Sequence, residues 1–200
     1  WNNLSGARRN LIEEMFKLLK QFSPGFTALS PRQRLISYFT REYPRLLDRR
    51  ALIDAVLKVS ESMELYGPGW ETHSDYRQYA KGIITTQEGL LDVYMRSRIN
   101  LANNTHGLGL HSRTLECMAV NGFIFTHDSP HDTKPGGMLT AFDPEVHFGQ
   151  FTLDNVVEES ERWIRDEKAR IEAGSAARTV VREQHCWQHR AQQIVDYLGK

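Results

Sequence analysis

The stretch Arg98–Asp128, RINLANNTHGLGLHSRTLECMAVNGFIFTHD, decides the fold, because it has the pattern of a strand, a glycine-bearing loop, a short helix and a second strand. The strands are predicted at Ile99–Ala102 and Phe123–Thr126, and the second is nearly all apolar, as a strand buried on both faces should be. Between them, Ser112 is a suitable N-cap and Asn121-Gly122 is the matching C-terminal stop. Such a strand-helix-strand unit is the repeating element of parallel sheets.

Further strands are expected on both sides of this unit. Two precede it, at Met63–Tyr66 and Gly82–Thr85, and one follows it, near either Met138–Phe142 or Phe148–Thr152. The alternation of strands with helices predicts an α/β fold, with a parallel sheet that helices flank. Ligands of such sheets bind at the carboxyl ends of the strands.

The remaining apolar patterns predict helices. Helices are expected at residues 6–22, Arg49–Lys58 and Ala176–Leu198. Three more are expected from their end signals: one begins at Ser30-Pro31, one is capped by Thr85 and Glu88, and one is capped by Asp154 and ends at Ala173-Gly174. We therefore divide the chain into a helical N-terminal segment, 1–50, and an α/β domain, 51–200.

Composition excludes several classes of protein. The 25 Lys and Arg balance the 25 Asp and Glu, so the chain lacks the basic footprint of a nucleic-acid-binding protein. No apolar run approaches the ~20 residues of a transmembrane helix, and no signal peptide is visible. Cys117 and Cys186 lack metal-type spacing, and two free thiols suit a reducing cytosol. We expect a cytoplasmic protein without a nucleic-acid partner or transmembrane segment.

The charge is nevertheless uneven. Residues 1–50 contain ten Lys and Arg but four Asp and Glu, a net charge of +6 that the rest of the chain balances. A solvated helix face, a phosphate-binding strip, and an arm through which Arg49 and Arg50 dock on a partner all fit this pattern.

The loop Asn103–His111 and the helix after it form a candidate anion site. Gly107 and Gly109 can adopt positive φ and let a phosphate approach the backbone, although paired glycines also occur in ordinary turns. The N–H groups and dipole at the helix start attract anions, and a cation in the first turn, Arg113, suits a bound phosphate. Glu116 could accept hydrogen bonds from a ribose diol or pair with Arg113. The pattern suggests a nucleotide or nucleotide-sugar site.

Histidines cluster near this loop, and some lie next to carboxylates. They are His106, His111, His127 and His131, with Asp128 and Asp132 beside the last two. No predicted helix fixes the ligand geometry that a zinc pair needs, so we expect no metal, and one of these imidazoles is instead a candidate for lining a phosphate or sugar pocket. His185, Trp187 and His189 are interpreted as packing and surface residues.

Four segments together resemble the C-terminal, donor-binding half of a GT-B glycosyltransferase. More narrowly, they resemble the spore-maturation, CgeB-like group with a "glycosyltransferases group 1" domain. The segments are Leu65–Trp70 (family pattern lyGxgW), Tyr79–Ile83 with Leu90–Leu101 (l..lY..skI.LN), Ser112–Ala119 with Gly122-Phe123 (R.fEalacGgf), and Gln184–Arg190 (hTy..R). The resemblance covers roughly residues 50–198.

The resemblance implies a Rossmann-like glycosyltransferase domain that binds a nucleoside-diphosphate sugar for transfer to an acceptor. Glu116 matches the glutamate that holds the ribose, and Gly82 and Ile83 match the backbone that meets the base. The diphosphate loop and helix start match Gly107, Leu108, Gly109, His111, Ser112 and Arg113. Such enzymes usually need no bound metal or other cofactor, because the helix dipole and basic residues stabilise the leaving diphosphate.

The sequence also departs from the family pattern. Leu108 stands where many members have a second glutamate, which contacts the donor sugar. Residues 1–50 are too short and too helical to be the acceptor-binding N-terminal half, which we expect to be a missing domain of the full-length protein. We therefore expect this fragment alone to bind donor weakly and to transfer nothing. A non-catalytic nucleotide-binding or protein-interaction module with the same fold is the alternative.

Overall fold

The computed structural model describes residues 30–39, 43–103 and 110–199, and the predicted helix at 6–22 lies outside them. The chain divides into two compact units, Trp1–Leu47 and Asp48–Lys200. In the first unit, helix α2 (Pro31–Ser37) begins as predicted, because the Ser30 and Gln33 side chains each accept a hydrogen bond from the other residue's backbone N–H. Helix α3 (Tyr43–Leu57) starts before the predicted Arg49, since Pro44 is tolerated in a first helical turn.

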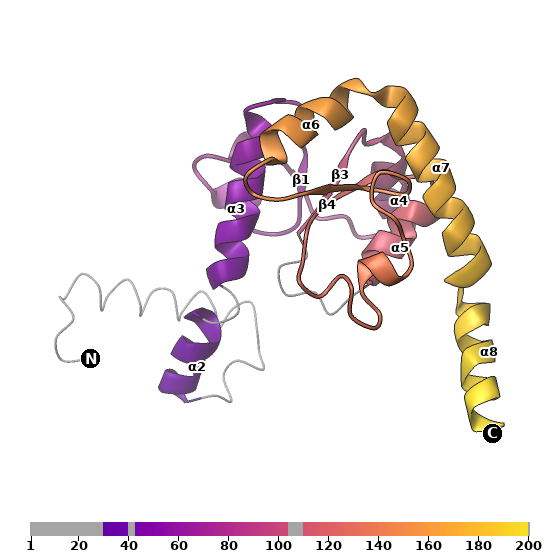
Figure 1. The fold of residues 1–200 in the computed structure, drawn as a ribbon. Coiled ribbons are helices and arrows are strands. Elements are labelled where there is room, and N and C mark those ends of the chain that lie inside the picture. The colour runs from indigo at the N-terminus through magenta and orange to yellow at the C-terminus, as the bar shows by residue number, and fades with distance from the viewer. Residues whose placement is uncertain (1–29, 40–42, 104–109, 200) are drawn as a thin grey trace. The chain divides into compact units, whose positions relative to one another are not determined.

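The described strands confirm the α/β class, and every pair of them is parallel. Figure 1 shows their arrangement with the helices. Their bounds are β1 (Leu65–Tyr66), β2 (Ala80–Gly82), β3 (Asn100–Ala102), β4 (Ile124–His127) and β5 (Gly149–Phe151). They form two sheets, a β1-β2 pair and a sheet of order β3-β4-β5. The strand after β4 thus lies at the second of its two predicted places, and Met138–Thr140 forms a 3₁₀ turn (η5).

The second strand was predicted too late in the sequence. It ends at Gly82, where φ of +80° leaves the extended conformation, so Ile83 and Thr85 follow the strand instead of forming it. Gly67, with φ of +115°, ends β1 in the same way, and its N–H donates to the Gly82 carbonyl at 2.8 Å. Two 3₁₀ turns, Trp70–Thr72 (η3) and Arg77–Tyr79 (η4), connect these strands.

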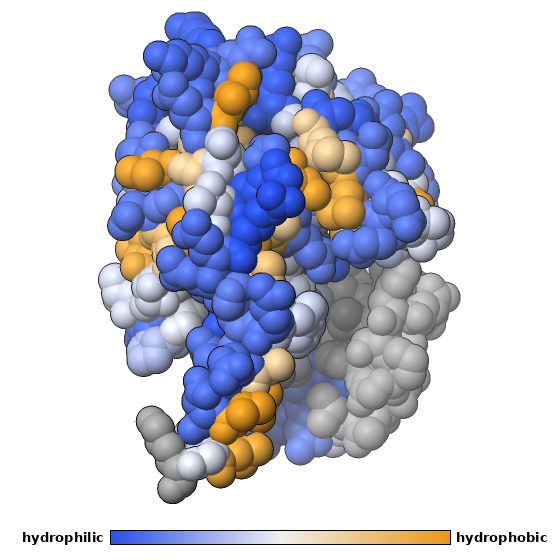
Figure 2. All heavy atoms as spheres, turned by 90° about the vertical axis from the view of Figure 1, so that its right-hand side faces the viewer, coloured by the Kyte–Doolittle hydropathy of each residue, from blue (hydrophilic) through white to orange (hydrophobic). Residues whose placement is uncertain are grey.

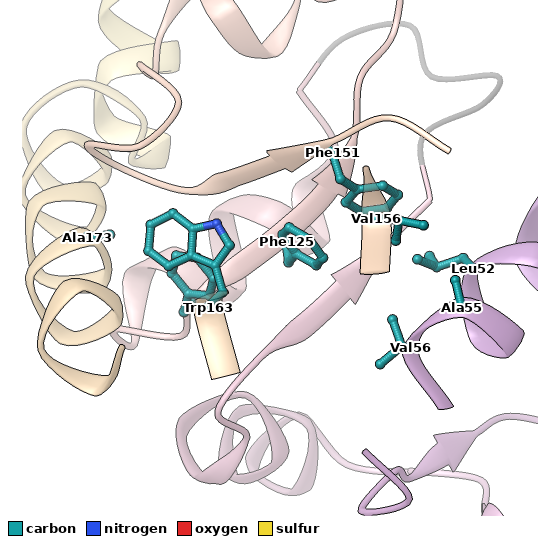
Figure 3. Close-up of a cluster of buried hydrophobic side chains, with 9 residues drawn as sticks. Leu52, Ala55, Val56, Phe125, Phe151, Val156, Trp163 and Ala173 are labelled. Atoms are coloured by element: carbon teal, nitrogen blue, oxygen red, sulfur yellow. The ribbon is translucent and has the colours of Figure 1, made fainter. Parts of the chain in front are cut away.

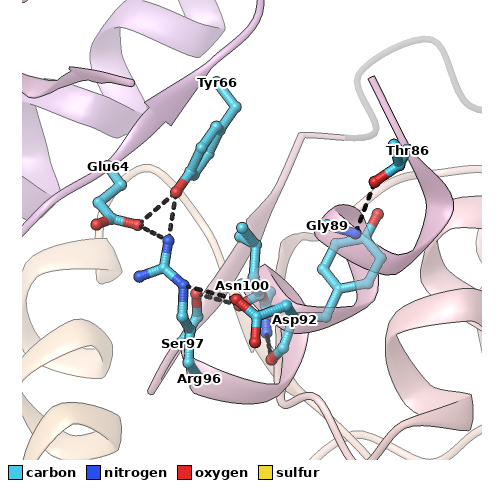
Figure 4. Close-up of polar contacts among 10 residues, drawn as sticks. Glu64, Tyr66, Thr86, Gly89, Asp92, Arg96, Ser97 and Asn100 are labelled. Atoms are coloured by element: carbon cyan, nitrogen blue, oxygen red, sulfur yellow. Dashed lines mark hydrogen bonds and ion pairs between the residues drawn. The ribbon is translucent and has the colours of Figure 1, made fainter. Parts of the chain in front are cut away.

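The N-cap of helix α4 (Gln87–Arg96) lies one residue later in the sequence than predicted. Thr86, not Thr85, is the N-cap, and its hydroxyl accepts from the Gly89 N–H at 3.1 Å (Figure 4). The predicted pairing of Thr85 with Glu88 is therefore wrong. At its other end, Arg96 donates to Glu64 at 2.6 Å and to the Tyr66 hydroxyl, and these bonds tie α4 to the β1 segment. The hydrogen bonds from Arg96 and Tyr66 lower the pKa of Glu64.

The C-terminal helices break at other residues than predicted. Helix α6 (Val156–Arg165) starts after Asn155, and Asp154 does not cap it. Helix α7 (Glu167–Gln184) runs through Ala173-Gly174 without interruption. Its start is fixed at Asp166, whose carboxylate accepts from the Ala169 N–H at 2.9 Å.

The predicted last helix is in fact two. Helix α7 ends at Gln184, and α8 (Trp187–Leu198) begins after Cys186. A glycine fits at position 174 of α7 because the Asn121 carbonyl oxygen lies close to it. An added Cβ would be 2.5 Å from that oxygen. Figure 2 turns the side with α7 and α8 toward the viewer.

Two apolar clusters lie on opposite faces of the β3-β4-β5 sheet. Because successive strand residues point to opposite faces, Phe125 enters one cluster and Ile124 the other. The first cluster packs α3 and α6 against the sheet and includes Leu52 and Trp163 (Figure 3). The second packs helix α5 (Ser112–Ala119) and α7 against the opposite face and includes Met118. The sheet is therefore the middle layer of an α/β/α arrangement.

Candidate functional site

Helix α5 starts on the carboxyl side of β3, where ligands of parallel sheets bind. Of the loop that leads to it, residues 104–109 lie outside the described residues, and so do the predicted site residues Gly107, Leu108 and Gly109, together with His106. The first described residue after the loop, Leu110, donates its N–H to the Gly136 carbonyl at 2.7 Å. This bond joins the start of α5 to the connection between β4 and β5.

The cap of α5 is His111, one residue before the predicted Ser112. Its Nδ1 accepts from the Arg113 N–H at 3.1 Å, and its carbonyl accepts from the Thr114 N–H at 3.0 Å. The first-turn N–H groups are thus partly satisfied by the protein itself. Within the described part of the chain, the Ser112 N–H makes no hydrogen bond. The side chains of His111, Ser112 and Arg113 are all exposed.

Glu116 lies one turn into α5 and is half-buried. Helical spacing would allow it to pair with Arg113, yet among the described residues the Glu116 carboxylate makes no ion pair and no hydrogen bond. No described residue therefore occupies its acceptor positions. Burial, and then the neighbouring Cys117 and Glu116, raise the pKa of Tyr94 on α4 to about 12.

The end of α5 is anchored in the core. Cys117 and Met118 are fully buried, and burial raises the pKa of the Cys117 thiol to about 12, so this thiol stays protonated and serves as packing. The predicted stop is confirmed: Asn121 adopts φ of +64°, and the Gly122 N–H donates to the Cys117 carbonyl at 2.9 Å. Packing thus fixes α5 from its C-terminal end, while its N-terminal end faces solvent.

A pocket of about 470 Å³ lies beside the start of α5. Leu110 and Leu115 line it, together with Gly136, Thr140 and Ala141 from the connection between β4 and β5. Gln184, His185 and Arg190, at the junction of α7 with α8, complete the lining. The sequence did not place Thr140, Gln184 or Arg190 near α5; the family-like segment Gln184–Arg190 was the only signal for the last two, and Thr140 had none.

His185 is held in this pocket by two neighbours. Its ring stacks on Phe142 with the centroids 5.3 Å apart, and its Nδ1 lies 2.7 Å from an Arg190 Nη. Burial, together with Arg190 and His189, lowers the pKa of His185, so the ring is neutral and Nδ1 accepts from Arg190. The Nε2–H is then a buried donor that finds no acceptor among the described residues.

Gly82 and Ile83 lie at the end of β2, in the other sheet. Gly82 has the left-handed φ given above, and the Ile83 side chain is exposed. No hydrogen bond among the described residues joins them to α5. The predicted contact of Gly82 and Ile83 with the base of the nucleotide therefore stays a prediction.

The other predicted histidines hold loops in place. His127 Nδ1 contacts the Asp128 carbonyl, and His131 Nδ1 lies 2.9 Å from the Lys134 Nζ. Buried Asp132 accepts from the Ser129 N–H at 2.9 Å and from Gln150 at 3.1 Å. In the described ranges, no three His, Cys, Asp or Glu residues converge as metal ligands would. None of the described helices combines the length and apolarity needed to cross a bilayer.

Comparison with known proteins gives one family. A family model described as glycosyl transferase-like matches residues 41–196, which include α5 and the pocket beside it. A search of curated proteins finds no match.

Proposed function

The chain belongs to the glycosyl transferase-like family, and on that premise we propose that it binds the nucleoside-diphosphate sugar donor of a sugar transfer at α5. Glu116 carries the proposal, because it is a half-buried carboxylate without a partner among the described residues. A carboxylate in this state accepts two hydrogen bonds from a ribose diol more readily than one already paired. The family-like segment Gln184–Arg190 supports the finer proposal that the chain is CgeB-like.

The diphosphate is proposed to lie at the start of α5, one turn before Glu116. There the Ser112 N–H, the helix dipole and the Arg113 side chain attract anions. During transfer, an acceptor hydroxyl forms a bond to the anomeric carbon, while the bond from that carbon to the diphosphate oxygen breaks. The negative charge that develops on the diphosphate is stabilised by these groups, without a metal. The acceptor proton must pass to a base other than Glu116, which holds the ribose.

His111 adds a cost to this binding. Its imidazole already accepts from the Arg113 N–H, so a diphosphate oxygen must replace it to use that amide. The loss of a helix cap costs about 1 kcal/mol. This competition favours weak binding by the chain.

A non-catalytic binding module remains the second candidate. The observation that favours it is Leu108, which stands where many of the group 1 glycosyltransferases that the chain resembles have a glutamate for the donor sugar. Such a module would bind the nucleoside diphosphate and its sugar conjugate equally well, because nothing would recognise the sugar.

Calorimetric titration with UDP and UMP, and with GDP and GMP, tests the diphosphate role. Each charge-assisted hydrogen bond that the added phosphate accepts contributes about 1.5–3 kcal/mol, so we expect at least one diphosphate to bind about 10-fold more tightly than its monophosphate. Arg113→Gln should reduce this advantage. The matched control is Arg182→Gln, which removes an exposed arginine of α7 and should leave the advantage of the diphosphate intact. Equal affinities within both pairs, or no binding by any nucleotide, would contradict the proposal.

A further inference from the structure

The pocket beside the start of α5 holds a positive charge that no described carboxylate balances. Among the described residues that line it, Arg190 is the only charged one, because His185 is neutral. Arg190 is half-buried, and it forms no ion pair with a described Asp or Glu. Burying a cation is costly unless an anion pairs with it. The pocket therefore favours an anionic ligand.

Two neighbours hold the Arg190 guanidinium and leave most of its donors open. One Nη donates to the His185 Nδ1 at 2.7 Å, and the other donates to the Gln193 amide oxygen at 3.0 Å. A guanidinium has five N–H donors, so the remaining three have no acceptor in the part of the chain that the structure describes. Such a fork suits the two oxygens of a carboxylate, which can accept from it side by side.

The rest of the pocket suits the body of a sugar. Its apolar walls are formed by Leu110, Leu115 and Ala141, on which the C–H groups of a sugar ring can pack. The Thr140 hydroxyl donates to the Gly137 carbonyl at 2.7 Å and can still accept from a sugar hydroxyl. The volume of about 470 Å³ is typical of a small-molecule site. The apolar walls also lower the local dielectric, which strengthens the attraction between the guanidinium and an anion.

The place of the pocket relates it to the proposed donor, and the inference rests on that proposed function. Leu110 directly precedes the cap of α5, so the pocket begins where the diphosphate is proposed to lie. The ribose is proposed to lie at Glu116, which is turned by about 100° around the helix from Leu115 in the pocket wall. The nucleoside and the pocket are thus on different sides of α5. The sugar, beyond the diphosphate, is the part of the donor that can enter the pocket.

We propose that the donor sugar carries a carboxylate, as a uronic acid does, and that Arg190 binds this carboxylate. His185 is a positioning residue, because it holds the guanidinium through Nδ1 while its own ring is stacked on Phe142. A neutral hexose would present a hydroxymethyl group to Arg190 and leave the charge unpaired. Hydrogen bonds from a guanidinium to a neutral hydroxyl are weaker than those to a carboxylate, so the pocket distinguishes the two sugars by charge.

Calorimetric titration with UDP-glucuronate and UDP-glucose tests the inference, or with GDP-mannuronate and GDP-mannose if the chain prefers guanosine. The members of each pair differ only at C6 of the sugar. The acidic conjugate should bind about 10-fold more tightly. Arg190→Gln should bring the two affinities within about 2-fold. His185→Phe retains a ring to stack on Phe142 but removes the acceptor for Arg190, so it should weaken the preference. Arg182→Gln, the matched control on α7, should keep it.

The outcomes separate this inference from the proposed function. If a nucleoside diphosphate binds but the wild type binds its acidic and neutral conjugates equally, the inference is wrong and the proposed function stands. A preference that survives Arg190→Gln would also overturn the inference, because the carboxylate would then lie elsewhere. If neither UDP nor GDP binds, the proposed function fails and the inference fails with it. Circular dichroism checks that the variants fold.

Discussion

Glu116→Ala is expected to weaken binding of the preferred nucleoside diphosphate by about 100-fold. The carboxylate makes no hydrogen bond or ion pair among the described residues, so its removal breaks no contact within them. In the complex it would accept two charge-assisted hydrogen bonds, each contributing about 1.5 kcal/mol or more, and every 1.4 kcal/mol corresponds to a factor of about ten. Calorimetric titration measures the loss, and thermal unfolding should show little change in stability.

Two controls separate ribose recognition from a general effect of charge. Glu172→Ala removes an exposed carboxylate from α7 and should leave affinity unchanged. The 2′-deoxy form of the same diphosphate should bind the wild type less tightly than the ribose form. Glu116→Ala should no longer distinguish the two, because the group that reads the hydroxyl is gone. A variant that still prefers the ribose form would show that another residue holds the diol.

Gly174→Ala should lower the free energy of unfolding by about 2 kcal/mol. At a solvated helix position, the same change would stabilise a protein by about 0.5–1 kcal/mol. Here the added Cβ would lie 2.5 Å from the Asn121 carbonyl oxygen, and the backbone must shift to relieve the overlap, which costs about 1–3 kcal/mol or more. The steric cost exceeds the gain in helix propensity.

Ser175→Ala on the exposed side of α7 is the matched control. It changes helix propensity without any close contact, so its effect should stay within about 0.5 kcal/mol. Denaturant unfolding of the two variants gives both values. If Gly174→Ala stabilised the protein, the close approach of α7 to the end of α5 would be wrong.

Local patterns predicted the elements better than their ends. The apolar run at Phe123–Thr126 predicted β4, and the turn signal at Asn121-Gly122 predicted the end of α5, because both depend on neighbouring residues. Gly174 misled the prediction of α7, since a glycine that normally weakens a helix is retained here for a contact with Asn121. That contact joins residues far apart in the sequence, so no local pattern could reveal it.

The same contrast between local patterns and long-range contacts applies to the candidate site. Glu116 was predicted from its place on a helix after a glycine loop, and the structure adds that Arg113 does not pair with it. The choice of His111 as the cap depends on how its side chain folds back onto the Arg113 N–H, which spacing does not determine. Arg190 and Leu115 line the same pocket although they are far apart in the sequence, so no local pattern could bring them together.

The proposed function requires that a diphosphate binds at the first turn of α5. Titration of ¹⁵N-labelled chain with the preferred nucleoside diphosphate, followed through backbone amide chemical shifts, tests it most directly. The largest changes should occur at Ser112 and Arg113, with Arg113 reporting the displacement of His111, while α6 stays unchanged. Saturable binding with changes confined to residues outside α5 and its adjoining loops would contradict the account.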